Sequence, residues 1–389
     1  MPVAQQETRP SSNLKGEAQR FWMRVTEGME AHQLWSEFAK DARSGYRFYS
    51  KGLAAQVEGH GGFRRAWLIA KALFWAILEK LSPARRVLML LALLCLFLPT
   101  TATTVNDEAG HLRLVGFDLH FWGGLLLLIV LLLELADRVV MKRDLEIAKE
   151  IQSWLLPGAP LQLPGYQIAH ATRPANTVAG DYYDVILRPG ATLTDGRVLF
   201  VVADVAGKSI PAAMLMATFQ ASLRTLSSSG ASLAELVAGL NRYACSNSQG
   251  GARFTTAFFA ELDSLTGHLV YVNAGHNAPL LRRRSGTLEH LETGGPPLGI
   301  STEFSHQAGV IDLGDGDWLV IFTDGVVEAV NATGKEYEES QLIQVVQDGA
   351  ASAPSELLRR LLASLDQFVG NTPQHDDMTC LLLKKASGS

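Results

Sequence analysis

The chain has 389 residues, 47% of them hydrophobic and 19% charged, with a formal net charge of -5. This length suggests more than one structural unit, and the acidic balance speaks against a nucleic-acid partner, which a strongly basic domain would favour. The three cysteines, Cys95, Cys245 and Cys380, form no CxxC pair, so they indicate isolated thiols rather than a disulfide framework or a zinc site.

The first segment, residues 1–62, has no pattern that assigns a domain to it. An amphipathic helix is predicted over 63–82, with Lys and Arg near its ends and bulky apolar residues between them. This distribution favours a juxtamembrane position at a membrane surface. A helix buried in a soluble core is the alternative.

Two apolar runs follow, at about 87–106 and 119–139. Because a membrane-spanning helix needs about 20 largely apolar residues, these runs predict a two-helix transmembrane hairpin over 83–140, with buried core helices as the alternative. Basic residues precede the first run and follow the second, and the positive-inside rule then places both ends of the chain in the cytoplasm. We therefore expect a multi-pass protein of the inner membrane, in contact with lipid.

Residues 141–157 predict a linker helix, which Pro157 ends. Its mostly apolar positions repeat at helical spacing on two neighbouring stripes. This spacing is consistent with pairing in a homodimer, and equally with packing on the chain's own C-terminal domain. The stripes are Met141, Leu145, Ala148, Gln152 and Leu155, and Ile147, Ile151 and Trp154.

Residues 158–386 show a different pattern, with short strands rich in Val, Phe and Tyr and bounded by Gly, Pro and Asp. Two helical blocks, 211–246 and 339–369, interrupt the strands. Strands followed by helices, twice, predict an α+β layered sandwich rather than a βαβ series. The predicted strands cover residues 166–174, 181–189, 197–205, 254–262, 268–276, 317–325 and 378–385.

Acidic residues stand at the ends of these strands. Asp204 and Asp324 each close a strand, Asp181 opens one, and Asp376 and Asp377 precede the last one. In antiparallel pairs the end of one strand lies beside the start of the next, so these carboxylates can gather at one edge of the sheets. Clustered carboxylates repel one another unless cations neutralise them. Because oxygen-only ligands favour Mg²⁺ or Mn²⁺ over zinc, the pattern predicts a site for such ions.

Several longer motifs occur in a fixed order from about residue 145 to the end. They are EIAKEIQSWLLP (146–157), PANTVAGDYYD (174–184), VVADVAGKSIPAAMLMA (201–217), FTTAFFAELD (254–263), YVNAGHNAPLL (271–281), GGPPLGI (294–300), WLVIFTDGVVEA (318–329) and HDDMTCLLL (375–383). Together they resemble the SpoIIE-like branch of the metal-dependent (PPM) protein serine/threonine phosphatases. Two positions depart from the family pattern, since Ala179 replaces the first glycine of GGD and Ser209 the last glycine of GKG.

The resemblance implies a four-layer α-β-β-α sandwich with two Mn²⁺ or Mg²⁺ ions between the sheets. Carried over by position, Asp204 would bridge both ions, and the Val205 carbonyl would bind one of them. Asp181 would bind the second ion, and Asp324 and Asp376 would bind the first. Asp204 and Asp181 are therefore the predicted catalytic residues, acting through the metals.

Two assignments stay open at this point. Asp377 is an alternative to its neighbour Asp376 as a metal ligand. His276, in the motif NAGHN, is consistent either with an acid near the site or with a histidine that shapes its loop.

The resemblance implies a phosphatase of phosphoserine and phosphothreonine, which hydrolyses its substrate with a metal-activated water. Together with the predicted hairpin, it leads us to expect a membrane-anchored enzyme. The implied substrate is a phosphorylated bacterial signalling regulator, such as an anti-sigma-factor antagonist. A membrane sensor or scaffold, whose phosphatase-like domain only binds partners, is the alternative. A metal-dependent phosphodiesterase or nuclease is a third hypothesis, which the acidic balance disfavours.

Overall fold

The computed structural model describes residues 71, 74–75, 78–99, 102–106, 112–116, 118–158, 161–192, 196–248 and 253–386. The chain divides into two compact units, one up to Asp137 and one from Arg138 onward. The unassigned segment 1–62 and most of the predicted amphipathic helix at 63–82 lie outside the described residues.

Helix α5 (Pro83–Phe97) follows the few described residues before it in the N-terminal unit. Strands β1 (Ala102–Asn106) and β2 (Leu112–Gly116) follow as an antiparallel pair, and the first part of helix α6 (Leu119–Leu155) completes the unit. Arg85 joins the two helices, since its guanidinium lies 3.2 Å from the Glu134 carboxylate and 2.6 Å from that of Asp137. Glu134, a charged residue within an apolar run, thereby gains a partner of opposite charge.

The structure does not support the predicted transmembrane hairpin. The first run, 87–106, is divided, because α5 ends at Phe97 and residues 102–106 form a strand that pairs with β2. The 15 residues of α5 rise roughly 22 Å at about 1.5 Å each, short of a hydrocarbon core of about 30 Å. The second run, 119–139, is part of the longer helix α6. In the described part of the chain, no helix has both the length and the apolar character needed to cross a membrane.

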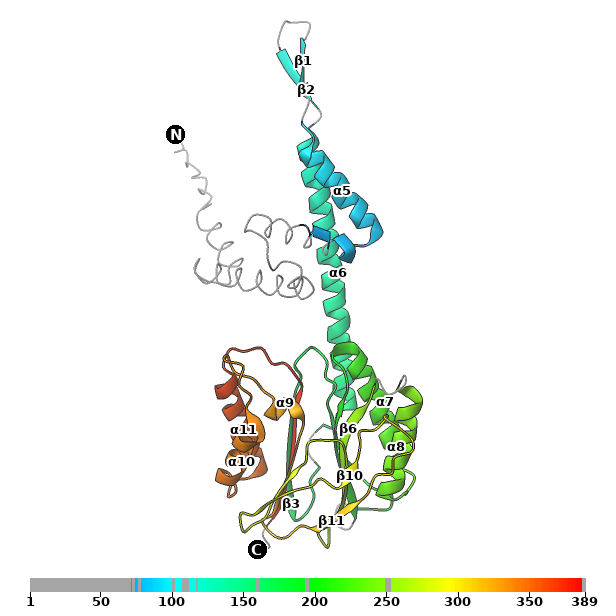
Figure 1. The fold of residues 1–389 in the computed structure, drawn as a ribbon, viewed down its shortest axis with the longest axis vertical. Helices are drawn as coiled ribbons and strands as arrows, with labels where there is room; N and C mark the ends of the chain where they lie inside the picture. The colour runs from blue at the N-terminus through cyan, green and yellow to red at the C-terminus, as the bar shows by residue number, and fades with distance from the viewer. Residues whose placement is uncertain are drawn as a thin grey trace, which may run out of the picture. The chain divides into compact units, whose positions relative to one another are not determined.

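Two sheets form the centre of the C-terminal unit (Figure 1). The first has the strand order β10-β7-β6-β5-β4, with β11 also paired to β7, and the second has the order β3-β13-β12-β8-β9. The strands of the first sheet are β4 (Tyr182–Leu187), β5 (Arg197–Val205), β6 (Thr255–Asp263), β7 (His268–Ala274), β10 (Gly294–Gly295) and β11 (Gly309–Asp312). Those of the second are β3 (Tyr166–Arg173), β8 (Leu280–Arg282), β9 (Leu288–His290), β12 (Trp318–Phe322) and β13 (Met378–Lys385).

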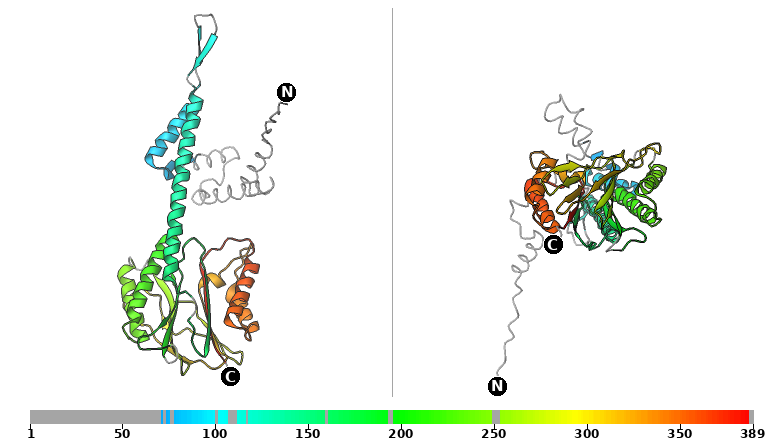
Figure 2. Two further views of the ribbon diagram at one scale, coloured as in Figure 1. Left: turned by 180° about the vertical axis from the view of Figure 1, so that it is seen from behind. Right: turned by 90° about the horizontal axis from the view of Figure 1, so that it is seen from below.

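Helices cover the outer face of each sheet, as Figures 1 and 2 show from different sides. Helices α7 (Ser209–Ser227) and α8 (Leu233–Asn247) pack on the first sheet. Helices α10 (Glu338–Asp348) and α11 (Pro354–Val369) pack on the second, and the short α9 (Asp324–Val327) follows β12 directly. The predicted four-layer α-β-β-α sandwich is therefore confirmed.

Strand β5 shows why the layers hold together. Phe200 and Val202 face the core between the two sheets, whereas Leu199 and Val201 face the core beneath α7 and α8. All four side chains are fully buried. Because successive side chains of a strand point to opposite faces, a strand covered on both sides reads as one continuous apolar run.

All seven predicted strands are present. Within the C-terminal unit, the strands that were not predicted are β8, β9, β10 and β11. They have two to four residues each and are too short to display an alternation of apolar and polar side chains. The predicted helical blocks 211–246 and 339–369 correspond to the pairs α7–α8 and α10–α11.

Candidate active site

Strand pairing in the first sheet brings two of the predicted aspartates together. Tyr182 of β4 is paired with Ala203 of β5. Asp181 and Asp204 are the next residues along these two strands, so they stand side by side at the sheet edge. Asp181 is buried, with 2% of its surface exposed, and Asp204 is partly buried.

The second sheet contributes the other carboxylates. Phe322 of β12 is paired with Cys380 of β13, which sets Asp324 beside the start of β13. Thr323 links the two sheets at this edge, because its Oγ1 donates to Asp181 Oδ2 over 2.8 Å and accepts from the Thr379 N–H over 2.9 Å. The acidic residues of both sheets are thus gathered at one edge of the sandwich.

Asp377 is occupied by the backbone of the loop before β4. Its Oδ1 accepts from the Ala175 N–H over 2.7 Å, and its Oδ2 accepts from the Gly180 N–H over 2.6 Å. The residue is 9% exposed. Both carboxylate oxygens therefore hold the loop 175–180 against the start of β13.

Asp376 has different surroundings. Its Oδ2 lies 2.8 Å from Lys208 Nζ, and 42% of its side chain is exposed. Lys208 also donates to the His375 carbonyl over 2.6 Å. Lys208, Glu328, Gln374, His375 and Asp376 lie together in the wall of one pocket. Asp376 thus lies beside open space, whereas Asp377 is held in the packed loop.

The electrostatics of this edge favour a cation. Burial raises the pKa of Asp204 to about 7, with the negative charges of Asp324 and Asp376 adding to the effect. Burial also raises the pKa of Asp181 well above its usual range, followed by the charge of Asp204. Asp324 is shifted in the same direction by burial and by Asp376. Burial and the neighbouring negative charges thus oppose the ionisation of each carboxylate.

The donor set fits Mn²⁺ or Mg²⁺ by its chemistry. The side chains offer oxygen atoms, and the glycine before Asp181 lets backbone approach closely: a Cβ at Gly180 would lie 3.1 Å from the Val205 carbonyl and 3.7 Å from Asp204 Oδ1. Within the described residues, no three Asp, Glu, His or Cys side chains are already arranged to hold one ion among them. The carboxylates interact through their charges but are not drawn around a common point.

His276 lies inside the protein near the same edge. It is 7% exposed, and its Nδ1 lies 3.2 Å from the hydroxyl of Thr256, which is paired in register with Asp204. Its backbone N–H donates to Asn273 Oδ1 over 2.7 Å. Burial lowers the pKa of His276 to about 4. The ring is therefore neutral near pH 7 and lacks the second, acidic proton of an imidazolium, which favours the loop-shaping interpretation.

Ser209 departs from the family pattern and has a strained backbone, with φ of 63° at the start of α7. A left-handed backbone conformation costs an L-residue about 1–2 kcal/mol, and glycine avoids this cost. Part of the gain is lost, because a glycine has more conformational entropy in the unfolded chain to lose on folding. We expect Ser209→Gly to raise the free energy of unfolding by about 0.5–1 kcal/mol. Urea denaturation of both proteins measures this, with Ser228→Gly, at the right-handed C-cap of α7, as the control that should not stabilise.

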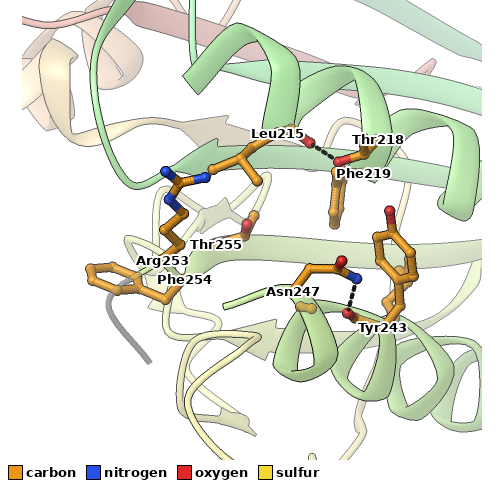
Figure 3. Close-up of a pocket in the computed structure, with 10 residues that line it drawn as sticks. Leu215, Thr218, Phe219, Tyr243, Asn247, Arg253, Phe254 and Thr255 are labelled. Atoms are coloured by element: carbon orange, nitrogen blue, oxygen red, sulfur yellow. Dashed lines mark hydrogen bonds between the residues drawn. The ribbon is translucent and has the colours of Figure 1, made fainter. Parts of the chain in front are cut away.

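A small pocket between α7, α8 and the start of β6 has a different character (Figure 3). Its lining is largely apolar, and the Arg253 side chain reaches toward Leu215 of α7. Because its lining residues include no Asp or Glu, this pocket lacks the ligands for a divalent cation. It is lined by Leu215, Thr218, Phe219, Leu240, Tyr243, Ala244, Asn247, Arg253, Phe254 and Thr255.

Three residues of this region make contacts that were not predicted from the sequence. Lys208 and Thr323 lie inside motifs that it quoted, directly beside Ser209 and Asp324, but no pattern indicated their contacts. Gln152 was grouped with an apolar stripe, although it binds the loop before Asp181. A polar residue on an otherwise apolar helix stripe was the available signal.

Comparison with known proteins agrees with this geometry. The family model described as Stage II sporulation protein E (SpoIIE) matches residues 194–386. The C-terminal domain belongs to the SpoIIE-like PPM phosphatases. The SiaA-PP2C domain of Pseudomonas aeruginosa has the same fold, with a TM-score of 0.57 and 20% identity over 64% of this chain and 98% of that domain.

Two relatives are similar to this chain over a longer stretch than the family model matches. The phosphoserine phosphatase RsbU of Bacillus subtilis is 28% identical over 246 residues, which cover 63% of this chain and 71% of RsbU. Protein IcfG of Synechocystis sp. is 28% identical over 269 residues, which cover 62% of this chain and 41% of IcfG. The chain thus matches less than half the length of IcfG.

Proposed function

We propose that this chain is a metal-dependent protein phosphatase that hydrolyses phosphoserine or phosphothreonine. The observation that carries the proposal is the meeting of carboxylates from both sheets at one edge, where burial and mutual repulsion raise the pKa values of Asp181, Asp204 and Asp324. Divalent cations would relieve this repulsion. RsbU, a phosphoserine phosphatase by its name, supports the same reaction here.

The proposed ligands follow from position and surroundings. Asp204 interacts through its charge with Asp181 of its own sheet and with Asp324 and Asp376 of the other sheet, which suits a bridging role. The backbone of Gly180 passes close to the Val205 carbonyl oxygen, which would lie 3.1 Å from a Cβ at Gly180. Asp181 would serve one ion, and Asp324 with Asp376 the other. Asp376 is preferred over Asp377, whose two oxygens already accept backbone N–H groups.

Two bound ions, Mn²⁺ or Mg²⁺, would supply activation of the attacking water and neutralise charge on the phosphoryl oxygens. The chain's own residues orient the ligands. Thr323 holds the Asp181 carboxylate, and Lys208, beside Asp376 and half-exposed at the pocket, can turn its ammonium toward a substrate phosphate once Asp376 is engaged elsewhere. Positioning and charge stabilisation account for most catalysis in phosphoryl transfer.

The reaction is tested on the full chain. We expect release of phosphate from an aryl phosphate and from a phosphoserine protein in Mn²⁺, and none with excess chelator. Mn²⁺ uptake by calorimetry without release from either substrate would instead support the scaffold hypothesis.

The pair Asp376 and Asp377 provides a sharper prediction. Asp376→Asn should reduce turnover strongly and leave the free energy of unfolding nearly unchanged. Asp377→Ala should lower that free energy by about 2–4 kcal/mol, because the buried Gly180 N–H and the partly buried Ala175 N–H lose their acceptor. Phosphate release in saturating Mn²⁺ and urea denaturation in chelator separate the two effects. Equal loss of stability in both variants would contradict the division of roles.

We further propose a phosphorylated signalling regulator, such as an anti-sigma-factor antagonist, as the substrate.

We also propose the cytoplasmic face of the inner membrane as the place of action. Exposed apolar side chains on α5 and the first part of α6, including Leu94, Phe97, Leu131 and Leu132, support peripheral contact with lipid. Co-sedimentation with vesicles should fall in a Leu94→Ser/Phe97→Ser variant. Unchanged binding, or no binding by the wild type, would contradict lipid contact.

A homodimer through the linker helix is also proposed. In one of the two predicted stripes, Gln152, Leu145, Ala148 and Leu155 are buried or half-buried, whereas Met141 is exposed. The other, Ile147, Ile151 and Trp154, is exposed, with 72% of Trp154 accessible. An exposed apolar stripe at helical spacing suits a second copy. Sedimentation of the wild type and of Trp154→Ser measures the proposed dimerisation through the linker helix.

A further inference from the structure

Gln152 is a buried polar residue on a largely exposed helix. Only 7% of its surface is accessible, whereas its helix neighbours Ile151 and Trp154 are 49% and 72% exposed. Its amide pairs with both backbone groups of one residue: Nε2 donates to the Ala179 carbonyl over 2.7 Å, and Oε1 accepts from the Ala179 N–H over 3.0 Å. This pairing satisfies the main chain of Ala179 as a neighbouring strand would.

The residue after Ala179 packs directly on the proposed metal ligands. The Gly180 N–H donates to Asp377 Oδ2 over 2.6 Å. A Cβ at Gly180 would approach the Val205 carbonyl to 3.1 Å and Asp204 Oδ1 to 3.7 Å. Any shift of the peptide between residues 179 and 180 therefore reaches the bridging carboxylate and the backbone ligand, as well as Asp181 next in the chain.

The loop before Asp181 has two independent anchors. Asp377 holds it from the second sheet, through the N–H groups of Ala175 and Gly180. Gln152 holds it from α6, through Ala179. Other contacts seat this end of α6: Leu156 packs against the cores on both faces of the first sheet, and the Tyr183 hydroxyl donates to the Pro157 carbonyl over 3.4 Å. Of these contacts, the Gln152 hydrogen bonds are the ones that reach the residue directly before Gly180.

We propose that Gln152 is a positioning residue for the metal centre, which sets metal affinity by holding the Ala179 peptide so that Gly180 and Asp181 stand in place beside Asp204. The proposal rests on the proposed metal-dependent function. Groups that orient metal ligands typically contribute 10–100-fold to metal affinity or activity. A displacement of α6 from the domain would break both Gln152 hydrogen bonds together and weaken the site.

Two variants of the full chain test this role. Gln152→Met keeps length and volume and removes both hydrogen bonds. Gln152→Glu keeps an acceptor for the Ala179 N–H and removes the amide donor to the Ala179 carbonyl. Gln344→Met makes the same chemical change on the exposed face of α10 and serves as the matched control.

Calorimetric titration with Mn²⁺ alone, well below each variant's unfolding temperature, measures metal affinity without turnover. We expect a 10–100-fold weaker Kd for Gln152→Met, a smaller defect for Gln152→Glu and wild-type affinity for Gln344→Met. Hydrogen exchange in chelator should be faster in residues 174–184 of Gln152→Met. With an aryl phosphate, saturating Mn²⁺ should restore most of kcat, because the defect lies in metal occupancy.

The outcomes separate this role from others. Wild-type Mn²⁺ affinity in folded Gln152→Met, with only a lower Tm, assigns Gln152 a purely structural role and overturns the proposal. Metal uptake by the wild type without phosphate release overturns the proposed phosphatase activity. The role of Gln152 is then still decided by the Mn²⁺ Kd of Gln152→Met. A wild-type chain that takes up no Mn²⁺ overturns both.

Discussion

Asp204→Asn is expected to reduce phosphate release by at least about 10³-fold. Bound metals supply several kcal/mol of transition-state stabilisation, and each 1.4 kcal/mol is a factor of ten in rate. An Asn at the bridging position keeps one neutral oxygen and loses the charge that two cations would share. The measurement is phosphate release from an aryl phosphate across a Mn²⁺ series. Asn in place of the exposed Asp315 is the control, which should retain full activity.

The same substitution is expected to stabilise the metal-free chain. The pKa of Asp204 is raised from 3.8 to about 7, so the contribution of this group to stability is fully present below pH 3.8 and is lost as the pH rises through about 7. Above that pH the buried carboxylate opposes folding, and its removal should raise the free energy of unfolding by up to about 4 kcal/mol. Urea denaturation in chelator at pH 8 tests this expectation. A loss of both activity and stability would indicate that Asp204 supports the fold instead of a metal.

A second large effect concerns His276. Burial lowers its pKa to about 4, from an ordinary value of 6.5. The neutral buried ring therefore contributes stability that is present above pH 6.5 and is lost as the pH falls toward 4, by up to about 3 kcal/mol. The expected result is a wild-type free energy of unfolding that falls over this window relative to that of His276→Gln, which has no ionisable group.

The comparison with His276→Gln is needed because the carboxylates act in the opposite direction. As the pH falls, protonation of Asp181 and Asp204 relieves their repulsion and stabilises the metal-free fold. The difference between wild type and His276→Gln, measured by urea denaturation in chelator from pH 7.5 to 4.5, isolates the histidine. A difference that does not change with pH would show that His276 is charged in the folded protein or exposed there.

Much of the phosphatase domain followed from local pattern. Strands such as β5 and β12 are uninterrupted apolar runs that end in aspartate, and burial on both faces selects such runs. The carboxylates could be placed at strand ends before any pairing was known, since antiparallel neighbours bring one strand's end to the next strand's start. The helical blocks were visible for the same reason, because helix-forming residues and apolar spacing lie within a short stretch of chain.

The membrane hairpin, which the structure does not support, was predicted from composition. An apolar run such as 87–106 can form a spanning helix, a core helix or a helix followed by a strand, and hydropathy does not separate these outcomes. The pairing of β1 with β2 depends on partners elsewhere in the chain. The division of the run at Phe97 was therefore not visible locally.

The acidic residues themselves, their order and their places at strand ends were readable from the chain. What required the tertiary structure was the difference between adjacent, chemically identical residues. Asp377 accepts two N–H groups from residues 175 and 180, about 200 positions earlier, whereas Asp376 lies beside Lys208. Gln152 likewise reads as one position on a helical stripe until its amide is seen to pair with Ala179. Local pattern determines which side chains reach an edge, but only the partners that folding brings from distant segments decide which are free to bind a ligand and which hold the site in place.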